Sequence, residues 1–228
     1  HTCGANLRKS QFTGCLLQLS PDICNTHGGG RRCVRKRLMS VVHPAIVETP
    51  KAVSTVSWMW ADEMATQTFA NALAQLPELH NAYLELVGNL GAGKTTFVRH
   101  LLKALGVQGR IKSPTYAVVE PHEGRHPATA QALAIWHFDF YRFNDPQEFE
   151  EAGFRDLFAS SGLKIAEWPE QAKGMLPPAD LMLTLTVNDL DARKVKVEAH
   201  TTQGQQLLEA LRNIVPPMPA SLHANSTT

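Results

Sequence analysis

The sequence lacks any uncharged apolar run of the roughly 18 residues that a membrane-spanning helix needs, which excludes a helical membrane protein. It also lacks the composition of a collagen-like chain, because it has 15 glycines and 14 prolines among 228 residues. A hydrophobic fraction of 43% is too high for a wholly disordered chain. Length and composition therefore predict one soluble domain with some flanking chain.

Cysteine is confined to the first 38 residues, where the four cysteines lack the paired CxxC spacing of structural zinc sites. The same segment holds seven Lys or Arg residues and one acidic residue, whereas the rest of the chain carries a net charge of −5. It has neither helical nor strand periodicity. We interpret residues 1–38 as a disordered basic leader or an artefact of upstream translation before Met39. The alternative is a basic arm that binds nucleic acid.

From residue 58 onward, stretches with helical periodicity alternate with stretches that have the period of a strand. The expected helices are residues 58–76, 94–105, 147–151 and 207–214. The expected strands are residues 83–87, 118–119, 135–141, 163–166, 181–187 and 195–199, of which the last two form a hairpin. A polar loop is expected at residues 122–129. This order predicts an α/β sheet with an antiparallel component.

The strongest motif is a phosphate-binding loop. Residues 88–95 read Gly-Asn-Leu-Gly-Ala-Gly-Lys-Thr and fit GxxxxGK[ST] between an expected strand and an expected helix. The glycines allow backbone angles that turn N–H groups toward phosphate oxygens, and the start of the helix adds its positive end. Lys94 can reach the β- and γ-phosphates, and the Thr95 hydroxyl can bind magnesium. The motif predicts a site for a nucleoside triphosphate and Mg²⁺.

These features predict a single P-loop NTPase-like domain of the α/β class, with helices that flank a mixed parallel and antiparallel sheet. The domain is expected at residues 58–214, with a flexible lead-in at residues 39–57 and a flexible tail at residues 215–228. Because no cysteine follows residue 38, the domain has no thiol to oxidise, and cysteine usage does not indicate its compartment. We expect the domain to be cytoplasmic.

The Asn-Lys-x-Asp element with which GTPases read guanine is absent, so ATP is the favoured nucleotide. Asp139 and Glu167 end apolar strands, where an acid can hold magnesium, directly or through water, or position the attacking water. Ser113 and Thr115 follow the P-loop helix, where a switch loop would cross the γ-phosphate. Without a triphosphate site, these acids would be ordinary caps and residues 113–116 a simple proline turn.

Four motifs in the order seen here resemble those of the bacterial TsaE family. They are the P-loop, Ser-Pro-Thr-Tyr at residues 113–116, His-Phe-Asp-Phe-Tyr-Arg at residues 137–142 and Glu-Trp-Pro-Glu at residues 167–170. A P-loop alone occurs in many families, whereas the four together are specific. The resemblance spans roughly residues 63–204. The chain departs from the family pattern in its first 38 residues and at Ala166, where the family has Ile or Val.

The resemblance implies an ATPase, with ATP and Mg²⁺ as cofactors, that is needed to form N6-threonylcarbamoyladenosine in tRNAs reading codons that begin with A. In that family the ATPase binds the TsaD–TsaB heterodimer, and ATP hydrolysis resets this complex between turnovers. The tRNA is then an indirect partner, reached through the complex. No arginine finger is evident, which fits a weak ATPase that its partners stimulate.

Carried over residue by residue, the resemblance implies that Asp139, Lys94 and Glu167 are catalytic. Thr95, Glu167 and Asp139 would face the metal, and whether Asp139 binds it or orders the water stays open. Trp168 would support the acids. The implied nucleotide-binding residues are Thr66, Gly88, Asn89, Leu90, Gly91, Ala92, Gly93, Lys94, Thr95, Thr96, Thr115, Trp168 and Arg193.

Two further readings of a P-loop chain remain open. A small-molecule kinase would need an arginine-rich lid over the phosphates, and residues 122–129 hold one arginine. A nucleotide-dependent binding scaffold would hold ATP and seldom cleave it. A rate of phosphate release that is slow alone and rises with TsaD and TsaB distinguishes the ATPase from both.

Overall fold

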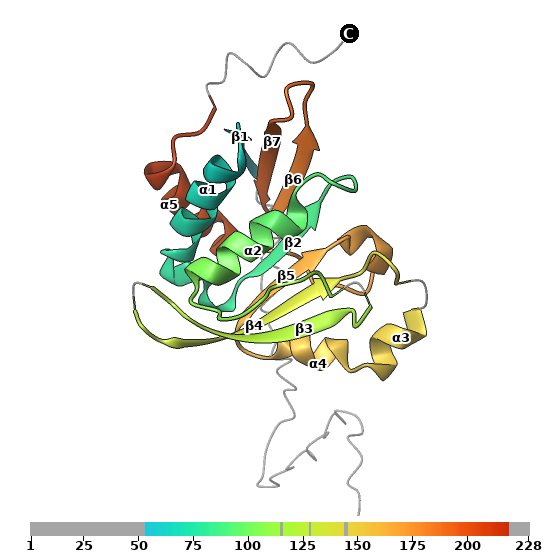
Figure 1. The fold of residues 1–228 in the computed structure, drawn as a ribbon. Helices are drawn as coiled ribbons and strands as arrows, with labels where there is room; N and C mark the ends of the chain where they lie inside the picture. The colour runs from blue at the N-terminus through green and yellow to red at the C-terminus, as the bar shows by residue number, and fades with distance from the viewer. Residues whose placement is uncertain (1–52, 115, 128, 144–145, 219–228) are drawn as a thin grey trace, which may run out of the picture. The chain divides into compact units, whose positions relative to one another are not determined.

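The computed structural model describes residues 53–114, 116–127, 129–143 and 146–218 (Figure 1). Residues 1–38, most of the expected lead-in and residues 219–228 of the expected tail lie outside this part of the chain. Among the described residues, no helix is long and apolar enough to cross a membrane.

The described residues form one seven-stranded sheet. Its strands are β1 (Ser54–Trp60), β2 (Tyr83–Val87), β3 (Val119–Arg125), β4 (Ala132–Asp139), β5 (Leu163–Glu167), β6 (Leu181–Val187) and β7 (Arg193–Ala199). The order across the sheet is β1-β7-β6-β2-β5-β4-β3. Strands β6, β2, β5 and β4 run parallel, while β1, β7 and β3 pair antiparallel at the two sides. The predicted α/β class with a mixed sheet is confirmed.

Two groups of helices cover different parts of the sheet (Figure 1). The helices are α1 (Glu63–Ala74), α2 (Lys94–Ala104), α3 (Pro146–Glu151), α4 (Phe154–Ala159) and α5 (Thr202–Ile214), with short 3-10 helices η1 (Pro77–Asn81) and η2 (Pro169–Ala172). Helices α1, α2 and α5 contribute to a largely aliphatic core on one face. Helices α3 and α4 pack on an aromatic cluster on the other face.

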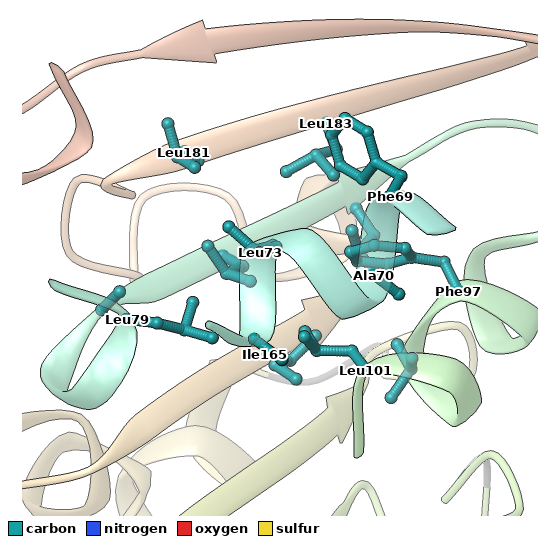
Figure 2. Packing of buried hydrophobic residues seen from close by; sticks show 14 of the residues in the cluster. Phe69, Ala70, Leu73, Leu79, Phe97, Leu101, Ile165, Leu181 and Leu183 are labelled. Atoms are coloured by element: carbon teal, nitrogen blue, oxygen red, sulfur yellow. The ribbon is translucent and has the colours of Figure 1, made fainter. Parts of the chain in front are cut away.

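The main core lies between the first helices and the parallel strands. Figure 2 shows Phe69 of α1 and Phe97 and Leu101 of α2 close to Ile165 and Leu183 of the sheet. All five side chains are buried. Burial of this size contributes roughly 1.5–3 kcal/mol per large apolar side chain, so α2 is held firmly where it leaves the P-loop.

The start of the domain differs from the sequence prediction, because residues 58–60 belong to strand β1 and not to a helix. Trp58 and Trp60 are buried while Met59 is 40% exposed, and this alternation is that of a strand. Helix α1 begins after Asp62, whose carboxylate accepts a hydrogen bond from the Ala65 N–H at 2.8 Å. The sheet thus starts at Ser54, inside the expected lead-in.

Two further segments differ from expectation. Residues 122–125, expected in a polar loop, lie in edge strand β3, whose outer side has no neighbouring strand among the described residues and so accepts polar side chains. Residues 215–218, expected in the tail, lie against β1: the Trp58 indole N–H donates to the Val215 carbonyl at 3.0 Å, and the Met218 N–H donates to the Ser57 carbonyl at 2.9 Å.

Candidate functional site

The P-loop connects β2 to α2, as the sequence predicts. Gly88 has φ 149°, and a Cβ there would lie 2.4 Å from the Leu185 carbonyl oxygen of β6. Gly91 and Gly93 have φ values of 80° and 102°, which L side chains rarely adopt. Three positions in this loop therefore require glycine, and the sharp turn brings the N-terminus of α2 to the carboxyl end of β2, where its free N–H groups favour anions.

Lys94 is buried at this turn with its ammonium group among neutral acceptors. Its Nζ donates to the carbonyls of Gly88 at 2.5 Å and Asn89 at 3.1 Å, and it lies 3.8 Å from the centre of the Trp168 ring. Burial lowers the pKa of Lys94, and the negative charge of Glu167 is the largest effect that opposes this shift. A phosphate in hydrogen-bonding contact would favour the charged amine far more than these carbonyls do.

Thr95 and Glu167 meet beside the P-loop. The Thr95 hydroxyl donates to Glu167 Oε2 at 2.8 Å, and Glu167 is the last residue of β5 and is buried. In the register of the parallel strands β4 and β5, Asp139 lies opposite Glu167. Two carboxylates and a hydroxyl at one point are the oxygen donors that Mg²⁺ prefers.

The metal site would be incomplete without the nucleotide. Among the described residues, no group of three or more His, Cys, Asp or Glu side chains could hold a metal ion. Mg²⁺ usually binds to one or two protein ligands and completes its shell with phosphate oxygens and water. The residues present at Thr95, Glu167 and Asp139 fit that pattern.

Asp139 is fixed by the segment that follows α2. The Ser113 hydroxyl donates to Asp139 Oδ2, and the Tyr141 N–H donates to Oδ1 at 3.0 Å. The Asp139 N–H donates to the Val118 carbonyl at 2.8 Å. The expected switch segment therefore lies against the acid, while Thr115, predicted to contact nucleotide, lies outside the described residues.

Sequence reasoning did not single out His137, whose Nε2 lies 2.9 Å from Glu167 Oε1 in a fully buried contact. The alternation of residues 135–141 places His137 on the same face as Asp139. That alternation was the available signal, but the pairing of β4 with β5 was needed to bring His137 to Glu167.

Two neighbouring cavities surround the P-loop. The first has a volume of about 290 Å³ and is called the P-loop cavity. Ser113 and Tyr141 line it together with ten of the predicted residues. These ten are Leu90, Gly91, Ala92, Gly93, Lys94, Thr95, Thr96, Asp139, Glu167 and Trp168. The second, of about 390 Å³, is called the side cavity; its predicted residues are Thr66, Ala92, Gly93, Thr96 and Arg193. Shared residues of the loop and α2 make the two cavities adjacent.

The remaining predicted residues lie on the other side of the loop. Gly88 and Asn89 line a third cavity against β6, which shares Leu90 and Ala92 with the P-loop cavity, and their carbonyls accept hydrogen bonds from Lys94. Leu90 is 78% exposed at the tip of the loop. The structure thus groups all described predicted residues around one loop and divides them between three of its sides.

Known proteins resemble this chain in sequence and in fold. The family model described as threonylcarbamoyl adenosine biosynthesis protein TsaE matches residues 60–195. A Haemophilus influenzae protein named tRNA threonylcarbamoyladenosine biosynthesis protein TsaE is 38% identical over 156 residues, which cover 67% of this chain and 94% of that protein. A Bacillus subtilis protein of the same name is 27% identical, over 68% of this chain and 93% of that protein.

The fold also matches a solved structure. The crystal structure of Bacillus subtilis YdiB superposes with a TM-score of 0.56 at 23% identity, over 72% of this chain and 97% of that one. The family model covers more than half of the chain, and its match includes the P-loop and the strands that carry Asp139 and Glu167. The chain belongs to the TsaE family.

Proposed function

We propose that this protein is an ATPase required for the formation of N6-threonylcarbamoyladenosine in tRNAs that read codons beginning with A. The names of its relatives support the pathway. The observation that carries the ATPase assignment is the contact of Thr95 with Glu167, opposite Asp139, at the mouth of a P-loop. This is where a triphosphate and its metal would meet the residues that act on the γ-phosphate.

One ATP molecule would occupy both cavities. The phosphates would lie in the P-loop cavity on the N-terminus of α2, and the nucleoside would lie in the side cavity near Thr66 and Arg193. Arg193 approaches the loop closely, since a Cβ on Gly93 would lie 3.7 Å from its Nε. The guanidinium is therefore positioned at the boundary between phosphate and nucleoside.

The side chains of the site then have separate tasks. Lys94 would exchange its carbonyl partners for phosphate oxygens and bind their charge. Thr95 and Glu167 would hold Mg²⁺, which supplies positive charge to neutralise the phosphates. Asp139, held by Ser113 and the Tyr141 N–H, would orient the attacking water or complete the metal shell. Trp168, stacked under Lys94 and 4.9 Å from Tyr141, would exclude bulk water.

The proposed partners are TsaD and TsaB, with tRNA reached through their complex, and ATP hydrolysis would reset that complex between turnovers. The four family motifs support this assignment. A slow rate without partners is expected because the one arginine of the four motifs, Arg142, stacks 4.4 Å from the ring centre of exposed Tyr116. The net charge of −5 after residue 38 argues against direct binding of nucleic acid as the main task.

The kinase alternative loses its candidate lid. Residues 122–125 are paired with β4 in strand β3 and cannot close over phosphates without breaking that pairing. The scaffold alternative predicts binding without turnover, so it is separated from the ATPase by a rate measurement.

The test is phosphate release from ATP by the full chain, alone and with TsaD and TsaB. We expect a slow rate that the partners raise, and a fall of about 100-fold in Asp139→Asn and Glu167→Gln with much smaller losses in nucleotide affinity. Glu150→Gln removes an exposed acid that pairs with Arg155 and serves as the control. If the two site variants released phosphate as fast as the wild-type protein, the roles given to these acids would be contradicted.

We further propose that residues 1–38 are dispensable for this activity. A protein that begins at Met39 should hydrolyse ATP and respond to TsaD and TsaB as the full chain does. Loss of tRNA binding on this deletion would instead favour the basic-arm reading.

A further inference from the structure

His137 contacts Glu167, one of the candidate metal ligands, at the carboxylate oxygen that Thr95 does not contact. His137 Nε2 and Glu167 Oε1 are 2.9 Å apart, and the two side chains are 0% and 2% exposed. They come from adjacent parallel strands, β4 and β5. Burial removes both partners from solvent, so a hydrogen bond between them is stronger than it would be in water.

The position of the proton follows from the partner. An ionised carboxylate only accepts hydrogen bonds, so Nε2 must carry the proton that it shares with Glu167. His137 Nδ1 is buried and has no hydrogen-bond partner among the residues that the structure describes. The opposite tautomer would leave a buried N–H unpaired and would place two acceptors in contact, which is the costlier arrangement. The Nε2–H tautomer is therefore the one that this site holds.

The Glu167 carboxylate is fixed from two sides. His137 occupies Oε1, and Thr95 donates to Oε2 at 2.8 Å. The ring of His122 on the neighbouring strand β3 lies beside that of His137, with 6.5 Å between the ring centres and 29° between the ring planes. With both ends restrained, the carboxylate has little freedom to turn away from the Thr95 hydroxyl.

We propose that His137 is a positioning residue that holds Glu167 in the orientation required to bind Mg²⁺ together with Thr95. The inference rests on the proposed function, since it assigns the metal to Thr95 and Glu167. It predicts a defect in the metal-dependent part of nucleotide binding, whereas nucleotide binding without metal depends on the P-loop and is left intact. Groups that orient metal ligands in this way typically contribute 10- to 100-fold in metal affinity.

Two amide variants test the role of the Nε2–H. In His137→Gln the side-chain amide nitrogen reaches about the place of Nε2 and can donate to Glu167, whereas in His137→Asn it reaches only the place of Nδ1. ADP affinity is measured with excess Mg²⁺ and with a chelator, with thermal unfolding as a check on folding. We expect Mg²⁺ to strengthen binding in the wild type and His137→Gln, and this strengthening to fall about tenfold in His137→Asn.

The outcomes separate the inference from the proposed function. If the wild-type protein bound ADP with the same affinity in excess Mg²⁺ and in chelator, the proposed function would be contradicted, and with it the metal role given to His137. A wild type that responds to Mg²⁺, together with His137→Asn that responds equally, would overturn the inference alone. Equal losses in His137→Asn with and without Mg²⁺ would also overturn it, because they indicate a general structural defect.

A spectroscopic measurement on the nucleotide-free wild type tests the geometry itself. Nitrogen-15 NMR of the imidazole should find a proton on Nε2 of His137. An Nε2 without a proton would overturn the proposal whatever the binding data show.

Discussion

The P-loop cavity and the side cavity are adjacent, yet they are built in different ways. Lys94, Asp139 and Glu167 in the P-loop cavity are each less than 5% exposed and are held by hydrogen bonds to the loop, Ser113 or Thr95. In the side cavity, Leu190 is 86% exposed and the Asp191 side chain 85% exposed. The charged groups that line the P-loop cavity are therefore fixed before a ligand binds, whereas the side cavity is lined in part by exposed side chains.

This difference predicts where the binding free energy arises. A group that is already fixed loses little conformational entropy when a ligand arrives, whereas an exposed side chain must be ordered at a cost of about 0.5–1.5 kcal/mol. Arg193 lies between the two cases, because its side chain is 25% exposed and its guanidinium contacts the exposed Asp191 carboxylate at 3.5 Å in a pair that solvent screens. We therefore expect the phosphates and metal to dominate affinity and the base to contribute little.

The largest expected effect is that of Lys94→Ala. It removes a cation whose hydrogen bonds to phosphate contribute about 1.5–3 kcal/mol each, so ADP affinity should fall about 100-fold. Lys103→Ala, an exposed lysine on the same helix, is the matched control. Calorimetric titration measures both, and an unchanged affinity in Lys94→Ala would remove the basis for a dominant phosphate end.

A second effect comes from the protonation of Lys94. Because burial lowers its pKa and phosphate would raise it again, ADP binding at alkaline pH should take up protons. The affinity for ADP is then highest at neutral pH, where Lys94 is charged. It falls as the pH rises through the pKa of Lys94 in the nucleotide-free protein, which lies below the ordinary value of 10.5. Titrations in two buffers of different ionisation enthalpy measure the uptake, which should vanish in Lys94→Ala. Proton release on binding would contradict this assignment.

Arg193→Ala should cost less. A partly exposed guanidinium contributes about 1 kcal/mol, so a loss of about fivefold in ATP affinity is expected. Arg212→Ala on α5, which removes an exposed pair with Glu209, should leave affinity unchanged. A loss in Arg193→Ala as large as that in Lys94→Ala would reverse the contrast between the two cavities.

Thr66→Val should have the smallest effect. The Thr66 hydroxyl already donates to the Asp62 carbonyl of its own helix at 3.2 Å, and the residue is buried. Valine keeps its shape, so ATP affinity should change by less than about threefold. A larger loss would show that Thr66 leaves its helix partner to contact the nucleoside.

The parts of the candidate site that depend on local sequence could be located from the sequence. The P-loop needs its glycines and Lys94 within eight consecutive residues, and Asp139 and Glu167 each end an apolar strand, so that parallel pairing brings them together. His137 was missed because its role depends on the neighbouring strand and not on its own segment. The roles of all these residues stay predictions until the variants are measured.

The errors in the fold also have local causes. Trp58, Met59 and Trp60 fit both a strand and the apolar period of the following helix, and the N-cap at Asp62 decides between them. Strand β3 is polar because it lies at the edge of the sheet, so residues 122–125 resemble a loop. Strand β1 also pairs with β7, which lies far along the chain, so no short window of the sequence contains its partner. Strand β3 pairs with the nearby β4, and its polar composition alone hid it.

The most direct test of the contrast is a calorimetric comparison of MgATP, magnesium tripolyphosphate and adenosine on the full chain. We expect tripolyphosphate to bind within about tenfold of ATP, a difference of about 1.4 kcal/mol, and adenosine to bind far more weakly than either. If adenosine bound nearly as tightly as ATP and tripolyphosphate did not bind measurably, the phosphates and the metal could not supply most of the binding free energy.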